Sequence, residues 1–350
     1  MKTFQKLKQD PKLWGRYWVR ERVIDAIRAY FKGEGFHEAE VPLLLPTPST
    51  EPFLEVFKTE LKDDQGNRWD GFLPSSPEFA LKKLLSAGSG SVFTITKSFR
   101  NGEGRSSRHN PEFTILEWYH ASGDYWTVAE QFQDLMIHIL NMVGSSDGQR
   151  VSKSAITYQG KEYSLKAPWE RISVAEAFQK YAGIDTEIML DEAKLKAVGK
   201  KKGYQVTEQT TWEEIWNQII ANEVEPQLGK NGPTILYDYP VAQAALARKA
   251  RDPRFAERWE VFLAGMELGN CFSELTDWRE QEARCKADLA ERKRLGKTEY
   301  PMDTAFIEAL KLGMPPTGGI AVGVDRLVAL FADTPSIADT LFFPVEEMFG

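Results

Sequence analysis

The chain has 350 residues, enough to bury a large core in one or two domains, and its 42% hydrophobic and 27% charged residues are typical of a globular protein. A formal net charge of −7 argues against a broad, sequence-independent nucleic-acid binder, although it leaves room for a local basic patch. Cys271 and Cys285 do not suggest a disulfide framework and favour the cytoplasm, and neither a signal peptide nor a membrane-spanning segment is expected.

Apolar periodicity and its breakers predict the elements of the first part of the chain. We expect helices over residues 14–31, 76–85 and 126–143, and strands over residues 36–46 and 92–96. Glycines follow the first helix directly, and prolines should end the first strand.

The second part is expected to begin with a mostly helical insertion over about residues 144–235, in which no chemistry is evident. Strand-like runs follow at residues 234–240, 258–275 and 318–331, and a charged, solvent-facing helix is expected at 277–295. This order of helices and strands predicts an α+β fold with a mostly antiparallel sheet.

The segment SFRNGEGRSSRHNPEFTILEWY, residues 98–119, places many donors directly before a strand. The donors in its loop are Arg100, Arg105, Arg108 and His109. Alternate residues of a strand share a face, which groups Phe113, Ile115, Glu117 and Tyr119. Because guanidinium groups suit planar contact with phosphate or carboxylate, we interpret the segment as a phosphate grip beside an aromatic platform for a base. The alternative is a charged hairpin on the surface.

The glycine-rich segment GGIAVGVDR begins at Gly318. Gly319, Ala321 and Gly323 should share one strand face, which would let a ligand or another backbone approach closely. Asp325 could cap the following helix, and Arg326 in its first turn should need an anionic partner. The alternative is tight packing of the sheet against a helix, with a surface arginine.

Three glutamates, Glu260, Glu267 and Glu274, are spaced seven residues apart in strand-like sequence. Glu260 and Glu267 have opposite parity and could meet only if the strand turns, for example at residues 264–265. Buried carboxylates need a cation, which Mg²⁺ on ATP or a substrate ammonium could supply. The alternative is pairing with Arg258 or Lys286. Glu78, after Ser76-Pro77, is a weaker hint of the same kind.

Three segments in this order resemble motifs 1, 2 and 3 of class II aminoacyl-tRNA synthetases. They are GFHEAEVPLLLP, FRNGEGRSSRHNPEFTILEWY and GGIAVGVDRLVALF, and SPEFALKKLL and GMELGNCFSELTD are similar to the lysyl branch. The resemblance covers about residues 14–345. It implies one catalytic domain over 1–350, with a mostly antiparallel sheet of six to seven strands, motif 1 at about 20–46, motif 2 at about 92–120 and motif 3 at about 318–331.

Motif 1 begins almost at once, which leaves no room for the anticodon-binding OB domain of lysyl-tRNA synthetases. The chain is therefore more similar to their stand-alone paralogues, the elongation factor P–lysine ligases, which share alanine at the position of Ala321. This resemblance implies ATP-dependent, Mg²⁺-assisted activation of lysine or β-lysine and transfer to a lysine of elongation factor P. It also implies a homodimer through motif 1, and tRNA is not expected as a partner.

The resemblance further implies roles for individual residues. Those implied to contact ATP are Arg100, Glu103, Asn110, Phe113, Glu267, Leu268, Gly323 and Arg326. Those implied to contact the amino acid are Ser76, Glu78, Glu117, Tyr119, Asn270, Glu274 and Ala321. Glu260 and Glu267 would hold Mg²⁺, and Arg100, Glu267 and Arg326 would be catalytic. Two departures from the pattern are a motif 2 loop that is one residue longer and Cys271 in place of a glycine.

Two other functions are compatible with these residues. The first is a lysyl-tRNA synthetase-like enzyme that charges tRNA without reading the anticodon. The second is a non-catalytic regulator that binds ATP or lysine, although a regulator would not need the intact set of Arg100, Glu267, Glu274 and Arg326.

Overall fold

The computed structural model describes residues 2–103, 106–144 and 154–349. Arg105 of the predicted phosphate grip lies outside these ranges, as do residues 145–153 near the start of the predicted insertion.

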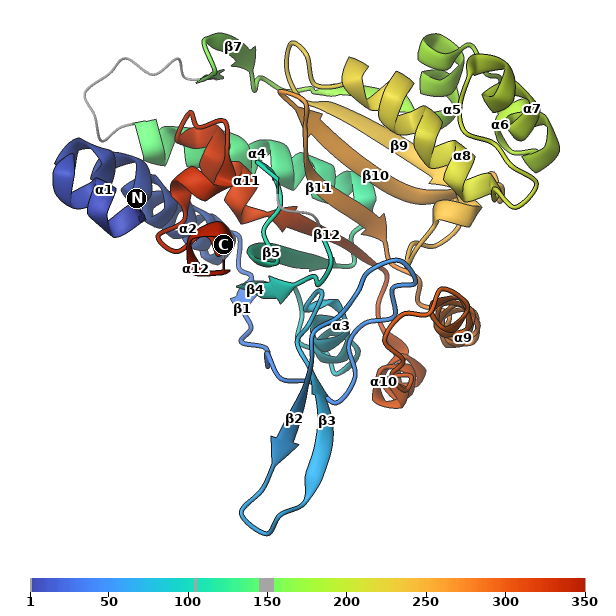
Figure 1. Ribbon diagram of the computed structural model, residues 1–350, viewed down its shortest axis with the longest axis horizontal. Coiled ribbons are helices and arrows are strands. Elements are labelled where there is room, and N and C mark those ends of the chain that lie inside the picture. Colours follow the sequence, from blue (N-terminus) through green and yellow to red (C-terminus); the bar gives the residue numbers. More distant parts are fainter. Residues whose placement is uncertain (1, 104–105, 145–153, 350) are drawn as a thin grey trace.

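A single large sheet organises the described chain (Figure 1). Its eight strands, in spatial order, are β1 (His37–Glu38), β4 (Val92–Phe99), β5 (Glu112–Ala121), β12 (Thr317–Gly323), β11 (Met266–Ser273), β10 (Phe255–Leu263), β9 (Thr234–Pro240) and β8 (Glu170–Ser173). The strands from β4 to β9 in this order are antiparallel, whereas β1 and β8 add short parallel edges. The expected mostly antiparallel α+β sheet is therefore confirmed.

Several elements differ from the predictions made for them. The sheet has eight strands instead of six to seven, and the strand-like run expected over residues 318–331 ends at Gly323, after which a helix begins. The strand expected over residues 36–46 is wrong in extent, because β1 has two residues and the chain then leaves the sheet and rejoins a neighbour only through the bridge of Leu45 to Phe72. Asp325 does not cap α11 (Val324–Phe331). Its carboxylate instead pairs with Arg20 and accepts a hydrogen bond of 2.9 Å from the Thr114 amide.

Helices and two hairpins surround the sheet. The remaining helices are α1 (Thr3–Gln9), α2 (Trp14–Gly33), α3 (Glu78–Ser86), α4 (Tyr125–Gly144), α5 (Val174–Ala177), α6 (Thr186–Met189), α7 (Glu192–Lys202), α8 (Trp212–Ile219), α9 (Trp278–Arg294), α10 (Thr304–Gly313) and α12 (Val345–Phe349). The hairpins are β2 (Lys58–Lys62) with β3 (Arg68–Phe72), which projects from the body in Figure 1, and β6 (Ala155–Tyr158) with β7 (Lys161–Ser164). Within the described ranges, no helix is both long and apolar enough to cross a bilayer.

One face of the sheet packs against α2 and α4 in the main core. The inward face of α2 consists of the buried Val19, Val23, Ile27 and Phe31, as its periodicity predicts. Gly318 allows β12 to approach the start of α4, because a Cβ there would lie 2.2 Å from the Asp124 carbonyl oxygen. This part of the glycine segment therefore serves packing.

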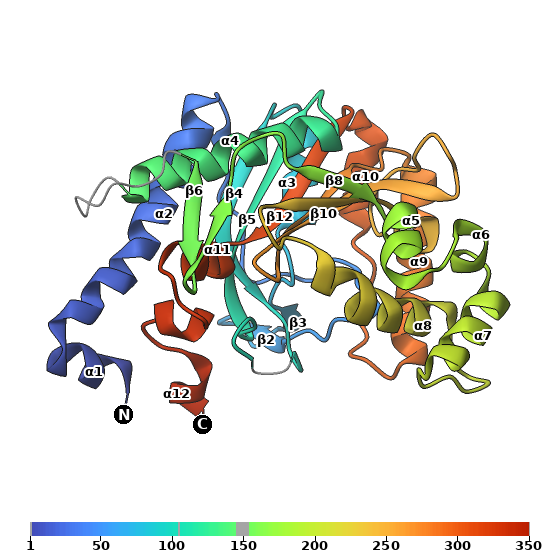
Figure 2. The same ribbon diagram turned by 90° about the horizontal axis from the view of Figure 1, so that it is seen from above.

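The other face of the central strands lies between α3 and α10 on one side and the helices α5 to α8 on the other (Figures 1 and 2). Phe79 of α3 stacks on Phe306 of α10, with ring centroids 4.0 Å apart, and fixes the start of α3 beside the sheet. The middle strands consequently present side chains to a cavity that residues of α3, α8 and α9 also line.

Candidate active site

A row of paired residues crosses five strands on the face that lines the cavity. Glu117 on β5 is opposite Ala321 on β12, Ala321 is opposite Asn270 on β11, and Asn270 is opposite Glu260 on β10. Glu260 is in turn opposite Leu236 on β9. Directly paired residues share a face, so residues more than 140 positions apart in the sequence become lateral neighbours.

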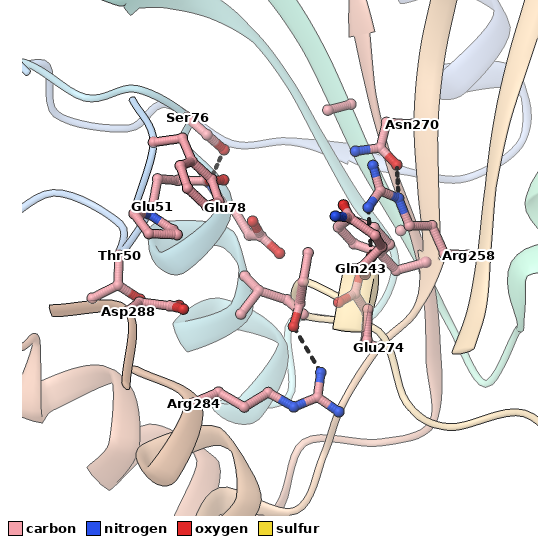
Figure 3. A pocket seen from close by; sticks show the side chains of 18 of the residues that line it. Thr50, Glu51, Ser76, Glu78, Gln243, Arg258, Asn270, Glu274, Arg284 and Asp288 are labelled. Carbon is pink, nitrogen blue, oxygen red and sulfur yellow. Dashed lines mark hydrogen bonds between the residues drawn. The ribbon is translucent and has the colours of Figure 1, made fainter. Parts of the chain in front are cut away.

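The cavity beside this row has a volume of about 680 Å³, within the range of small-molecule sites (Figure 3). All seven residues expected to contact an amino acid line it: Ser76, Glu78, Glu117, Tyr119, Asn270, Glu274 and Ala321. Of the residues expected to contact ATP, Arg100 lines it, whereas the others lie outside its lining: Glu103, Asn110, Phe113, Glu267, Leu268, Gly323 and Arg326.

Glu117 is the buried acid at one end of the row, with 1% of its surface exposed. Its carboxylate accepts hydrogen bonds from the Ser76 hydroxyl at 2.5 Å and from the Tyr119 hydroxyl at 2.9 Å. Burial, and next the nearby Glu78 carboxylate, raise the pKa of Glu117 to about 8. A cation placed beside Glu117 would therefore be strongly favoured, because it would compensate an expensive buried charge.

Glu78 and Glu274 form a second acidic group around a buried lysine. Lys82, which is fully buried, lies 2.5 Å from Glu78 Oε1 and 2.5 Å from Glu274 Oε2. Burial remains the largest influence on Glu274 and raises the pKa of its carboxyl to about 8, although Lys82 opposes this. Lys82 thus supplies part of the positive charge that the buried carboxylate of Glu274 was predicted to need.

Gly319 makes room for these groups. A Cβ at this position would lie 2.2 Å from Glu274 Oε1 and 2.5 Å from the Tyr119 ring. The bare strand face expected from the glycine segment therefore lets a carboxylate and a phenol from neighbouring strands converge above the backbone.

Arg100 follows β4 and lies between the cavity and Phe113. Its guanidinium carbon is 5.1 Å from the centre of the Phe113 ring, and one of its terminal nitrogens is 3.4 Å from Glu103 Oε1. Its Nε is buried and has no hydrogen-bond partner in the described part of the chain. A buried donor without a partner is costly, which is consistent with a position prepared for an anionic ligand.

Arg326 joins the glycine segment to the β10–β11 hairpin. It donates to the Glu267 carbonyl oxygen at 2.7 Å and lies 3.2 Å from the Glu267 carboxylate, and its other terminal nitrogen is 3.1 Å from His109 Nε2. Burial and the Arg326 charge lower the pKa of His109. The anionic partner predicted for Arg326 is therefore Glu267.

The expected turn is present at residues 264–265, and it brings Glu267 close enough to Glu260 for its charge to contribute to raising the pKa of Glu260, after burial, although the residue directly opposite Glu260 is Asn270. Both turn residues have positive φ, 53° and 73°, and one extra residue on β11 shifts the register between Val261 and Phe262. Glu260 pairs with Arg258 at 2.6 Å and accepts a bond of 2.8 Å from the Tyr239 hydroxyl. Arg258 is one of the partners considered in the alternative interpretation.

The two carboxylates of Glu260 and Glu267 suit Mg²⁺ only if a ligand completes the site. In the described ranges, no three or more His, Cys, Asp or Glu residues are grouped so that they could hold a metal ion. However, Mg²⁺ in nucleotide sites commonly uses one or two carboxylates together with phosphate oxygens. The side chain of Glu267 is also 40% exposed, so that it is accessible to such a ligand.

Asn110 has both ends of its amide engaged within the chain. It donates to the Glu112 carbonyl oxygen at 2.5 Å and accepts from the Val345 amide at 3.3 Å. These contacts connect the loop before β5 to α12.

A further set of cavity residues was not found by the sequence analysis. The α9 side of the cavity, as we call it, is lined by Glu51, Glu213, Gln243, Arg284 and Asp288 (Figure 3). Burial is the main cause that raises the pKa of Glu51 to about 7 and that of Asp288 to about 6. Arg284 is committed to Glu280 and to the carbonyl oxygens of residues 245 and 247. The charged helix expected at 277–295 is present as α9 and exposes residues such as Arg279, Lys286 and Arg294, but part of it also lines the cavity, which was not expected.

Comparison with known proteins agrees with this geometry. Residues 3–347 match the family model for tRNA synthetases class II (D, K and N). Among curated proteins, the chain is similar to the lysine–tRNA ligases of Oceanobacillus iheyensis (36% identity), Moorella thermoacetica (35%) and Staphylococcus aureus MRSA252 (34%), over 96%, 96% and 93% of its own length. It spans 65%, 66% and 63% of their lengths, which is less than two thirds in each. The chain belongs to the class II tRNA synthetases of the D, K and N group.

Proposed function

We propose that the protein uses ATP to activate lysine or β-lysine as an aminoacyl adenylate and transfers the aminoacyl group to a lysine side chain of elongation factor P. The observation that carries the first step is the cavity in which Arg100 lies together with the buried carboxylates Glu117 and Glu274. Arg100 offers a cation for the carboxylate of a diamino acid, and Glu117 and Glu274 offer acidic groups for its two amines.

In the first step, the substrate carboxylate attacks the α-phosphorus of ATP, and pyrophosphate leaves. Arg100 would hold the attacking carboxylate and the α-phosphate together, which can supply roughly 7–11 kcal/mol of the reduction in barrier. Phe113 would support the adenine, and Arg326 would neutralise charge on the phosphates. Glu260 and Glu267 would hold Mg²⁺, which neutralises phosphate charge when it is bound.

The α9 side of the cavity supports an amine as the acceptor in the second step. Glu51 and Asp288 have no hydrogen bond or ion pair from their carboxyl groups to another described residue, and both line the cavity that holds the amino-acid contacts. Such acids attract a protein ammonium group and repel the phosphates of a nucleic acid. A homodimer through residues 20–46 belongs to the same proposal.

A screen of amino acids by ATP–pyrophosphate exchange tests the activation step. We expect exchange with lysine or β-lysine, and exchange at least about 100-fold weaker with norleucine, because an unpaired buried acid would remain in the complex. Norleucine is the matched control, since it keeps the length of lysine and lacks the terminal amine. Equal exchange with both compounds, or none with any diamino acid, would contradict the proposal.

The double substitution Glu51→Gln/Asp288→Asn tests the acceptor step. We expect pyrophosphate exchange within about twofold of wild type and transfer to elongation factor P reduced about tenfold, the effect of roughly 1.4 kcal/mol of lost attraction. Single-turnover transfer from preformed adenylate measures it. Glu291→Gln is the control, because Glu291 lines the same cavity but is paired with Arg294 at 2.6 Å. Undiminished transfer by the double variant would refute the assignment.

A second candidate function is the charging of tRNA. The proteins to which the chain is similar are named lysine–tRNA ligases, which favours this candidate. Assays with both acceptors distinguish the two functions, since robust charging of tRNA without transfer to elongation factor P would replace the first candidate by the second.

A further inference from the structure

Lys82 is a buried cation that contacts the cavity wall from behind. It has 0% of its surface exposed and lies on α3, one turn after Glu78. Its ammonium group is 2.5 Å from Glu78 Oε1 and 2.5 Å from Glu274 Oε2. Both carboxylates line the cavity, whereas Lys82 does not.

The Glu274 carboxylate forms its ion pair with this cation through Oε2, which has no hydrogen bond within the described residues. Its Oε1 is buried, has no hydrogen-bond partner in the described part of the chain, and occupies the space above Gly319 beside the Tyr119 ring. A buried acceptor without a partner costs stability unless a ligand donates to it. Glu274 therefore pairs with Lys82 through Oε2 and has Oε1 available to accept a hydrogen bond from a ligand.

We propose that Lys82 is a specificity-determining residue, which sets the part of the cavity beside α3 to accept two ammonium groups by neutralising one of the three acids there, Glu78, Glu117 and Glu274, and holding Glu274 Oε1 towards the substrate. The inference rests on the proposed function, since it concerns how that site selects a diamino acid. Lys82 does not touch the substrate in this account and acts through Glu274.

The charge balance of the cavity supports this role. Beside α3, Glu78, Glu117 and Glu274 carry three negative charges when ionised, and Lys82 supplies one positive charge, so that this group leaves two negative charges for the two amines of the substrate. Without Lys82, three buried acids would lie close together with no cation among them, and they would bind protons instead of the substrate. Removing Lys82 should therefore weaken the binding of a diamine and raise the pH at which the diamine binds best.

The variant Lys82→Met keeps the length of the side chain and removes its charge. We expect the KM for lysine in pyrophosphate exchange to rise about 30-fold, whereas the KM for ATP should stay within about twofold of wild type. The lysine KM decreases as the pH rises, and in the variant this decrease should occur about one pH unit higher. The double variant Glu78→Gln/Lys82→Met restores the net charge and should recover the lysine KM to within about fivefold of wild type. Lys83→Ala is the matched control, because Lys83 on the same helix pairs with Asp303, away from the cavity.

Several results would overturn the proposal: an unchanged lysine KM in Lys82→Met, equal increases in the KM values for lysine and ATP, or no recovery in the double variant. If Lys82→Met does not fold, the double variant and its pH profile still decide, because it removes one positive and one negative charge together and so buries one uncompensated acid fewer than Lys82→Met does. If the wild type shows no ATP–pyrophosphate exchange with any amino acid, the proposed function is wrong. The role of Lys82 can then still be tested by measuring the binding of lysine to the same variants by calorimetry.

Discussion

Replacing Arg100 with alanine is expected to lower ATP–pyrophosphate exchange by about 10²–10³-fold. The side chain lines the cavity, places its guanidinium over the Phe113 ring, and has a buried Nε with no hydrogen-bond partner among the residues that the structure describes. Loss of one preorganised donor to a developing negative charge typically costs this much in rate. The expected loss is in kcat, with a smaller change in the KM for the amino acid, because the interaction strengthens as the phosphate is attacked.

The control for Arg100→Ala is Lys97→Ala. Lys97 is a cation on β4, three residues before Arg100, but it pairs with Glu112 at 3.3 Å and does not line the cavity. Exchange by Lys97→Ala should equal that of wild type. If Arg100→Ala retained more than about a tenth of wild-type exchange, Arg100 would not be the group that holds the reacting anions.

Replacing Glu117 with glutamine is expected to raise the KM for lysine by about 30- to 1,000-fold, because a buried ammonium would lose its carboxylate at a cost of about 2–4 kcal/mol. The KM for ATP should change little. The amide keeps the shape of the side chain and can still accept a hydrogen bond from Ser76 or Tyr119, whose bonds to Glu117 are 2.5 and 2.9 Å long. Steady-state exchange at several lysine concentrations measures the effect, and an unchanged lysine KM would exclude Glu117 as an amine ligand.

The pH dependence provides a second measurement on Glu117→Gln. Since the pKa of Glu117 in the folded protein is raised to about 8 from the ordinary 4.5, the folded state holds a proton that the unfolded state releases between these values. Stability should therefore fall as pH rises from about 4.5 to 8, and glutamine should remove this part of the loss. Wild-type lysine binding, which requires the carboxylate, should instead improve up to about pH 8. A variant that was merely misfolded would lose stability at every pH.

Local sequence could predict those site residues whose positions follow from strand parity and turn chemistry. Glu117 and Tyr119 share a face because they are two residues apart on β5. The turn at residues 264–265 could be inferred because Glu260 and Glu267 cannot otherwise meet. The resemblance to the family motifs was needed to predict that strands far apart in the sequence contribute to one site, because no local pattern contains this information.

Other features depend on tertiary packing and leave no signal in local sequence. Asp288 and Arg284 lie on a charged helix, and only the placement of α9 against the loop after β9 brings them to the cavity. In the sequence, Lys82 cannot be distinguished from an ordinary helical lysine, because only the packing of α3 buries it against Glu274, the residue that follows β11. The early end of β1 also depends on context, because the bridge of Leu45 to Phe72 competes with continued pairing in the main sheet.

Gly319 has a consequence for how this pocket could evolve. Even a methyl group there would overlap the Glu274 carboxylate and the Tyr119 ring at 2.2 and 2.5 Å. Both contacts come from separate strands, so that a lineage could not introduce a side chain at this position and repair the damage with one compensating change. A new substrate class would have to arise through the walls of the pocket, while its backbone floor stayed fixed.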